Sequence, residues 1–178
     1  MYVFICPRCG FVRQGGRRDL PTITVDEICY NCAKREPAPR PASPTEITKY
    51  LTGLDSEHGG HGALRHGSWT DLNWHKDRLP TTRLFASTKY ADPETQLQAL
   101  RDIMHTVRSS PRLREMMEAG MPFVIVVEHG VPVDEGWWMD RDGPKPIRGL
   151  TRSKAVFRAG QYQHPYTYFP TPQEATDL

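Results

Sequence analysis

The sequence predicts an α+β protein in two parts, and two observations lead to this fold class. Four cysteines fall within the first 32 residues, whereas the rest of the chain mixes helix-like and strand-like hydrophobic patterns. A length of 178 residues suits one ordinary domain with a small appendage. We therefore expect a β-structured module over residues 1–36, a proline-rich spacer over 37–44, and an α+β domain over 45–178 in which a helical pair packs on a small sheet.

Composition excludes several classes of protein. The longest apolar runs, Met1–Cys6 and Phe123–Val127, are too short to span a bilayer or to form the core of a signal peptide. The net charge of +2 is small for a disordered chain, and glycine and proline show no collagen-like period. These patterns indicate a protein of a reducing, cytoplasmic compartment that does not enter a membrane.

The cysteines occur as two Cys-x2-Cys pairs, a spacing typical of zinc sites. A tight turn brings the thiolates of each pair close enough to share one ion, and two such turns complete a tetrahedron. Pro7 and Gly10 suit the first turn, and β-rich stretches at 2–5 and 23–28 predict strands that lead into both turns. Iron bound as in rubredoxin is the alternative metal, and a redox-active pair is the less common use of this spacing. The predicted ligands of one structural Zn²⁺ are Cys6, Cys9, Cys29 and Cys32.

The segments CPRCG and CYNC at this separation resemble the zinc ribbon family, and the resemblance covers residues 1–36. It implies one structural zinc on a small β scaffold. It also implies contact with nucleic acid, or docking onto the machinery of transcription, translation or processing. A module of this size buries too little apolar surface to fold without a metal or a partner.

Residues 35–44, REPAPRPASP, predict an extended spacer. Ser43, Pro44 and Glu46 have the spacing of a helix capping box, which predicts a short helix to about Leu51 that ends at Gly53. Residues 55–80 are polar and dotted with glycine and histidine, so we expect no regular structure there.

Two helices are predicted in the middle of the chain. Asp92 and Pro93 begin the first, whose apolar residues recur on one face. Ser110 and Pro111 begin the second, and Gly120 ends it in a left-handed conformation. Together they predict a helical hairpin or a kinked pair.

Strand signals surround these helices. The stretch 122–128 is the only uninterrupted apolar strand candidate outside the cysteine module, so we expect it in the middle of a sheet. Residues 81–87 alternate as a strand, and 131–139 and 155–158 predict weaker strands with a turn at 142–144.

Basic residues gather in two places. The first 40 residues hold seven basic and four acidic side chains, and arginine can bind phosphate through forked hydrogen bonds. A second stretch, from Arg141 to Arg158, is interleaved with aromatic residues, as suits a single nucleic-acid strand. The alternatives are a solvated loop for the first cluster and a charge-protected edge strand for the second. The predicted nucleic-acid contacts are Arg8, Arg13, Arg17, Arg18, Arg148, Arg152 and Lys154.

The histidine-rich stretch offers two further candidates. His58, His61 and His66 are possible ligands of a second metal, with solvated loop histidines as the alternative. The triplet His66-Gly67-Ser68 is similar to the short histidine-glycine signature of ADP-ribosyltransferases, a likeness of three residues from which no role is transferred. Acids around the 122–128 strand, such as Glu128, suit a metal-dependent nuclease, although the expected lysine is absent and ion pairing is the alternative.

No nucleophile elbow, phosphate loop or dinucleotide fingerprint appears in the sequence. The sequence therefore favours a non-enzymatic zinc-binding accessory protein that contacts nucleic acid or docks onto a nucleic-acid-processing machine. One alternative is a structural or assembly protein, viral and located in a virion, whose zinc module staples it into a larger complex. Another is a small hydrolase or transferase that uses the loop from His58 to His75 with the acids near Glu128.

Overall fold

The structure is a computed structural model that describes residues 2–5, 12–15, 42–82, 84–160 and 163–173. The chain divides into two units, residues 1–42 and 43–178. The four cysteines, the predicted strand over 23–28 and most of the predicted spacer lie outside the described residues. In the first unit, β1 (Tyr2–Ile5) and β2 (Val12–Gly15) form an antiparallel pair, which confirms the predicted strand over 2–5.

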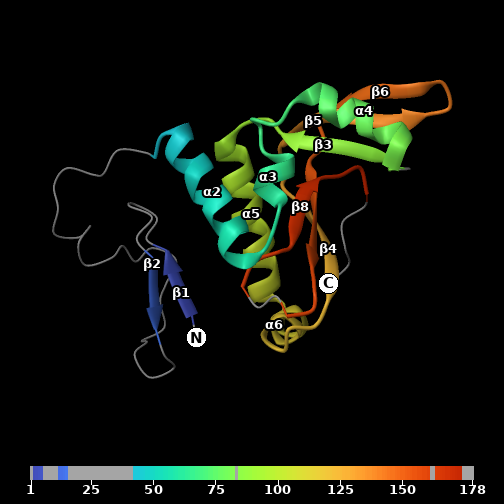
Figure 1. Cartoon of the computed structure of the whole chain (residues 1–178). Helices are drawn as coiled ribbons and strands as arrows, with labels where there is room; N and C mark the ends of the chain where they lie inside the picture. The colour runs from blue at the N-terminus through green and yellow to red at the C-terminus, as the bar shows by residue number, and fades with distance from the viewer. Residues whose placement is uncertain (1, 6–11, 16–41, 83, 161–162, 174–178) are drawn as a thin grey trace. The chain divides into compact units, whose positions relative to one another are not determined.

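The described part of the second unit is an α+β fold with five helices and two small antiparallel sheets (Figure 1). Its first helix, α2 (Pro44–His58), begins with the predicted capping box, in which Glu46 N–H donates to Ser43 Oγ at 3.3 Å. The predicted end at Gly53 is wrong, because the helix continues to His58 and ends at Gly59, where φ is 67°. The buried stripe of the helix continues past Gly53 to Asp55, and Leu54 also packs against the core. The buried residues of this stripe are Ile47, Leu51 and Asp55.

Residues 59–82 contain two helices where we predicted no regular structure, α3 (Gly62–His66) and α4 (Leu72–Thr82). α4 buries only His75 and Leu79, so its apolar pattern is too sparse to indicate a helix. The first amides of α3 donate to the buried carboxylate of Asp55, which lies in another helix. Both helices therefore depend on contacts that local sequence does not encode.

The strand predicted over 81–87 is displaced, because α4 occupies its first residues and β3 spans Ala86–Tyr90. The alternation that suggested the earlier strand included Leu84 and Phe85, which are 37% and 61% exposed. Four residues of β3 are buried in succession, Ser87, Thr88, Lys89 and Tyr90.

The predicted helical pair is confirmed as α5 (Pro93–Ser109) and α6 (Pro111–Glu118). Asp92 caps α5 by accepting the Thr95 N–H at 2.6 Å, and Gly120 follows α6 with φ of 64°. α2 packs beside α5, and α6 lies at the opposite end of this unit from α4 (Figure 1).

The two sheets have three strands each. The first has the order β3-β5-β6, with β5 at Asp134–Asp140 and β6 at Gly143–Arg148. The second has the order β4-β7-β8, made of β4 (Phe123–Glu128), β7 (Arg152–Phe157) and β8 (Thr167–Pro170). The prediction that 122–128 occupies the middle of its sheet is wrong, because β7 is the middle of these three described strands.

Side chains of β3 connect the two sheets. The Tyr90 hydroxyl donates to Ser153 Oγ at 2.9 Å, and the Thr88 hydroxyl donates to the Pro170 carbonyl. α3 and α4 contact β3, so the segment from His61 to Thr82 is held at this junction (Figure 1). Among the described helices, none is long and apolar enough to cross a membrane.

Candidate nucleic-acid interface

The predicted nucleic-acid contacts of the second unit lie on β6 and β7. Arg152 Nε donates to Glu128 Oε2 at 2.8 Å, Lys154 is half-buried, and Arg148 is exposed. Bonds from Thr151, the Gly130 amide and Arg152 lower the pKa of Glu128 to about 2. This acid is therefore an ion-pair partner of the basic stretch, as are Asp140 and Asp142, which both pair with Lys145.

The predicted sites of the first unit are mostly outside the described residues. This applies to the zinc ligands and to three of the four arginines, whereas Arg13 lies in β2 opposite Phe4. The residues outside are Cys6, Cys9, Cys29, Cys32, Arg8, Arg17 and Arg18.

The three histidines proposed as a second metal site have different partners. The ring of His58 stacks on His164 at 5.6 Å between centroids, whereas the ring of His61 meets Tyr166 edge-on at 4.4 Å. His66 Nδ1 donates to the Thr88 carbonyl at 2.7 Å. Among the described residues, no group of three histidine, cysteine or acidic side chains is placed to hold a metal ion.

His66 and His75 lie together, with 5.8 Å between ring centroids, but both are buried. Burial lowers the pKa of His66 to about 3 and that of His75 to about 4. The contacts described for Glu128 are with Arg152 of β7, with Thr151 just before that strand and with Gly130 of its own turn, not with these rings. Within the loop named in the enzyme alternative, His66 and His75 therefore lie together, and no described contact joins them to Glu128.

The hydrogen bonds of His75 define its tautomer. The Thr70 hydroxyl donates to the Gly67 carbonyl at 2.8 Å, so Nε2 of His75 donates to Thr70 Oγ1 at 3.0 Å. Nδ1 then accepts from the hydroxyl of Ser87 at 2.8 Å. Ser87 is only 3% exposed, so this serine–histidine pair connects β3 to α4 and does not face a substrate.

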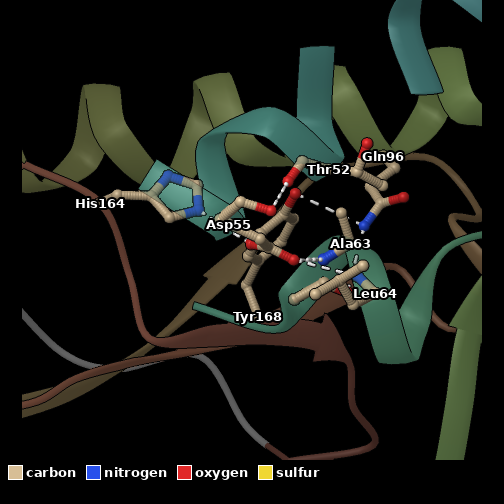
Figure 2. A network of polar contacts seen from close by, with 9 residues as sticks. Thr52, Asp55, Ala63, Leu64, Gln96, His164 and Tyr168 are labelled. Carbon is tan, nitrogen blue, oxygen red and sulfur yellow. Dashed lines mark hydrogen bonds and ion pairs between the residues drawn. The ribbon is translucent and has the colours of Figure 1, made fainter. Parts of the chain in front are cut away.

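Asp55 organises the segment that follows it. Figure 2 shows its carboxylate between the start of α3 and the ring of His164. Oδ2 accepts the amides of Ala63 at 2.7 Å and Leu64 at 3.0 Å, and Oδ1 lies 3.2 Å from Nε2 of His164. The side chain has no exposed surface, so these two amides and the imidazole take the place of the water molecules that would solvate an exposed carboxylate. The chain can then turn sharply between α2 and α3.

Sequence reasoning missed Asp55, although one signal pointed to it. Asp55 follows Ile47 and Leu51 at intervals of four residues, which places it on the buried stripe of α2. A buried carboxylate requires hydrogen-bonding groups close to it in space. One of these groups, the ring of His164, is far from Asp55 in the sequence. The neighbouring Gln96 amide, 3.4 Å from both the Gly62 carbonyl and the Tyr168 hydroxyl, gave no such signal.

The segment held in this way displays a group of cationic and aromatic side chains. The guanidinium of Arg78 lies 4.5 Å from the ring centroid of Trp74, one turn earlier on α4. The guanidinium of Arg158 lies 3.3 Å from the ring centroid of Tyr166, whose carbonyl accepts the His61 amide at 2.8 Å. With Arg65 on α3, these residues form what we call the cationic surface: His61, Arg65, Trp74, Arg78, Arg158 and Tyr166.

The charges of this surface act on one another. Burial lowers the pKa of His61, and the positive charges of Arg65, Arg158 and Arg78 lower it further against the opposite effect of Asp55. Burial and the charge of Arg65 also lower the pKa of Arg78. Within the described part of the chain, Arg65 and Arg78 form no ion pair with a carboxylate. The surface therefore carries a positive potential that favours an anion.

Comparison of the chain with models of known protein families finds no match, and comparisons with curated proteins and with solved structures find none either. The cationic surface and the cysteine spacing are therefore the features of the chain that bear on its function.

Proposed function

We propose that this protein is a zinc-binding accessory factor that binds nucleic acid, and that the cationic surface contacts its phosphate backbone. The observation that supports this most is that Arg65 lies close enough to Arg78 for its charge to lower the pKa of Arg78, while neither guanidinium pairs with a carboxylate among the described residues. A guanidinium that stacks on a ring keeps its in-plane N–H groups available for phosphate oxygens. Exposed Trp74, 42% accessible, adds an aromatic element.

The first unit adds a second part to the proposal. Cys6, Cys9, Cys29 and Cys32 would hold one structural Zn²⁺, because their spacing suits a closed tetrahedral site. The arginines beside them would provide further phosphate contacts: Arg8, Arg13, Arg17 and Arg18.

The test is binding of the full chain to a fluorescein-labelled single-stranded oligonucleotide, followed by anisotropy over a salt series. Replacing both Arg65 and Arg78 with glutamine should weaken binding about tenfold or more and reduce the slope against log salt by about 1.5, as expected for two lost phosphate contacts. The matched control replaces Arg112 and Arg114 with glutamine, because these exposed arginines of α6 lie at the other end of the unit (Figure 1).

Two results would contradict the proposal. If the wild-type chain fails to bind the oligonucleotide at about 50 mM salt, nucleic acid is not the ligand. If the α6 control loses as much affinity as the Arg65 and Arg78 variant, binding depends on total charge and the cationic surface is not the site.

One observation favours a second candidate function, docking onto a protein assembly. An open apolar depression lies beside α4, and Phe85 in it is 61% exposed with its ring 5.9 Å from that of Trp138. Its lining residues are Leu79, Pro80, Leu84, Phe85 and Met139. If this function holds, Phe85→Ser should release a protein partner from the native complex and leave oligonucleotide affinity unchanged. Equal recovery of the partner with both chains would argue against it.

A further inference from the structure

The loop between α3 and α4 presents a tryptophan that takes part in none of the described ring contacts. Trp69 is 39% exposed, although its neighbours on both sides are held by the protein. Among the described residues, no aromatic ring or cation lies over its indole. By contrast, the guanidinium of Arg78 already lies over the ring of Trp74, and the rings of Trp74 and His75 form a T-shaped contact.

Lys89 of β3 holds the backbone on both sides of Trp69. Its ammonium donates to the Ser68 carbonyl at 2.9 Å and to the Thr70 carbonyl at 3.0 Å, and it lies 3.2 Å from Glu135. Lys89 is 8% exposed, and a lysine is rarely buried unless its ammonium group is paired. Two carbonyls that flank a single residue therefore share one buried cation.

A second set of bonds holds the same loop from α4. The Thr70 hydroxyl donates to the Gly67 carbonyl, and His75 connects Thr70 to Ser87 of β3. The loop is thus bonded to β3 through a lysine and through a histidine. Such a network of satisfied polar groups rigidifies the segment that it connects.

The indole of Trp69 lies directly against Gly67. An added Cβ at Gly67 would lie 2.3 Å from Cζ2 of Trp69, so only glycine leaves room for the ring there. The backbone of Gly67, with φ of −69° and ψ of 153°, suits any residue, so glycine serves the ring and not the chain. An exposed aromatic ring that already packs against the backbone on one side loses less entropy when a flat ligand stacks on it than a fully free ring does.

We propose that Trp69 is a stacking platform for an unpaired base of a single-stranded nucleic acid, whose phosphates Arg65 and Arg78 bind. This rests on the proposed function. Arg65 is two residues before Gly67, against which the indole packs, and the charge of Arg65 acts on Arg78 of α4, so the ring and the two cations belong to the segment from α3 to α4. Every base has a flat face, and stacking on an aromatic side chain therefore favours single strands over duplexes with little sequence preference.

The experiment compares a fluorescein-labelled dT12 strand with a blunt duplex of equal length, using the full chain. Trp69→Ala should weaken binding of the single strand about tenfold, with the salt slope and the affinity for the duplex unchanged. Trp69→Phe should retain most of the affinity, because phenylalanine keeps a ring. Phe85→Ala is the matched control, since Phe85 is also an exposed aromatic residue and lies in the apolar depression.

Gly67→Ala provides a second variant in which the tryptophan remains but its ring is displaced. It should lose affinity for the single strand to a similar extent, with an unchanged melting temperature showing that the chain folds. Wild-type affinity of both Trp69→Ala and Gly67→Ala, while the Arg65 and Arg78 variant loses binding, would overturn the platform and leave the proposed function intact. No binding of either oligonucleotide by the wild-type chain would overturn both.

Discussion

Asp55 is a fully buried carboxylate whose oxygens lie within hydrogen-bond distance of two amides and a histidine ring. Replacing it with alanine leaves the Ala63 and Leu64 amides and the ring of His164 without their acceptor. We expect Asp55→Ala to lower the free energy of unfolding by about 3–5 kcal/mol, as is usual when one partner of a buried pair is removed. Urea unfolding of the full chain, monitored by circular dichroism, measures this loss.

Asp77→Ala is the matched control, because Asp77 is an exposed aspartate on α4. Asp77→Ala should change the free energy of unfolding by no more than about 0.5 kcal/mol. Asp55→Asn should lower the free energy of unfolding by an amount between those of the two alanine variants, since the amide oxygen still accepts one N–H. Equal stability of Asp55→Ala and Asp77→Ala would show that the network contributes nothing to folding.

At the scale of elements, Gly53 provides a direct test of where α2 ends. It lies inside the helix, and an added Cβ meets no atom within 4 Å. Gly53→Ala should therefore raise the free energy of unfolding by about 1 kcal/mol, because alanine restricts the unfolded chain and favours the helix. Gly59→Ala should lower it by about 1 kcal/mol, since its φ is 67°. A destabilising Gly53→Ala would mean that the helix stops earlier, as the sequence alone suggests.

Sequence predicted the helices whose signals are local and missed those whose signals are not. α5 has a capping aspartate, a proline at its first turn and five apolar residues on one face, and these local features predict it. α4 buries only His75 and Leu79 and contains Pro80, and its His75 bonds to Thr70 and Ser87. Periodicity cannot reveal a helix that buries so few apolar residues.

The candidate site was only partly predictable for a related reason. The sequence indicated a basic, aromatic-rich stretch from Arg141 to Arg158, and the last of these arginines does lie on the cationic surface. Arg65 and Arg78 form no cluster in the sequence, and only the folding of α3 and α4 places them near Arg158. Proximity of this kind depends on the turn after Asp55, which no local pattern encodes.

At the scale of the whole molecule, two buried histidines make folding sensitive to acid. His66 and His75 have pKa values of about 3 and about 4, below the usual 6.5, because burial disfavours their charged forms. The unfolded chain binds these protons first, so their contribution is complete above about pH 6.5 and is lost as the pH falls toward 4. Each contributes a slope approaching about 1.4 kcal/mol per pH unit.

Asp134 has the opposite effect on the pH dependence of stability. Burial raises its pKa to about 6 from 3.8, so the folded state takes up this proton first and gains stability as the pH falls from 6 toward 4. Two histidines outweigh one aspartate, and the net free energy of unfolding should decrease on acidification. Denaturation curves between pH 4.5 and 7.5 measure this slope. His75→Gln should reduce it, whereas replacing the exposed His105 with glutamine should not; identical slopes in all three chains would contradict the assignment.

Removal of the metal tests whether a zinc ion stabilises the fold of the first unit. If the four cysteines hold one Zn²⁺, a chelator should release one zinc per chain and unfold the module, because the metal supplies its folding free energy. A thiol reagent should then modify four cysteines. The cooperative transition of the second unit should remain, since its buried core consists of residues beyond 43. Unchanged near-ultraviolet signals after complete zinc release would refute a structural role for the metal.

The Asp55–His164 pair also bears on how the chain is made. The two residues are 109 positions apart, and His61 likewise depends on Tyr166 for its backbone bond. During synthesis, a nascent chain that has emerged only as far as α6 has the carboxylate of Asp55 but not its imidazole partner. We expect α3 to become ordered only after β8 leaves the ribosome, because domains complete their packing as units. The arginines of the cationic surface would then reach their final positions only after β8 has been synthesised.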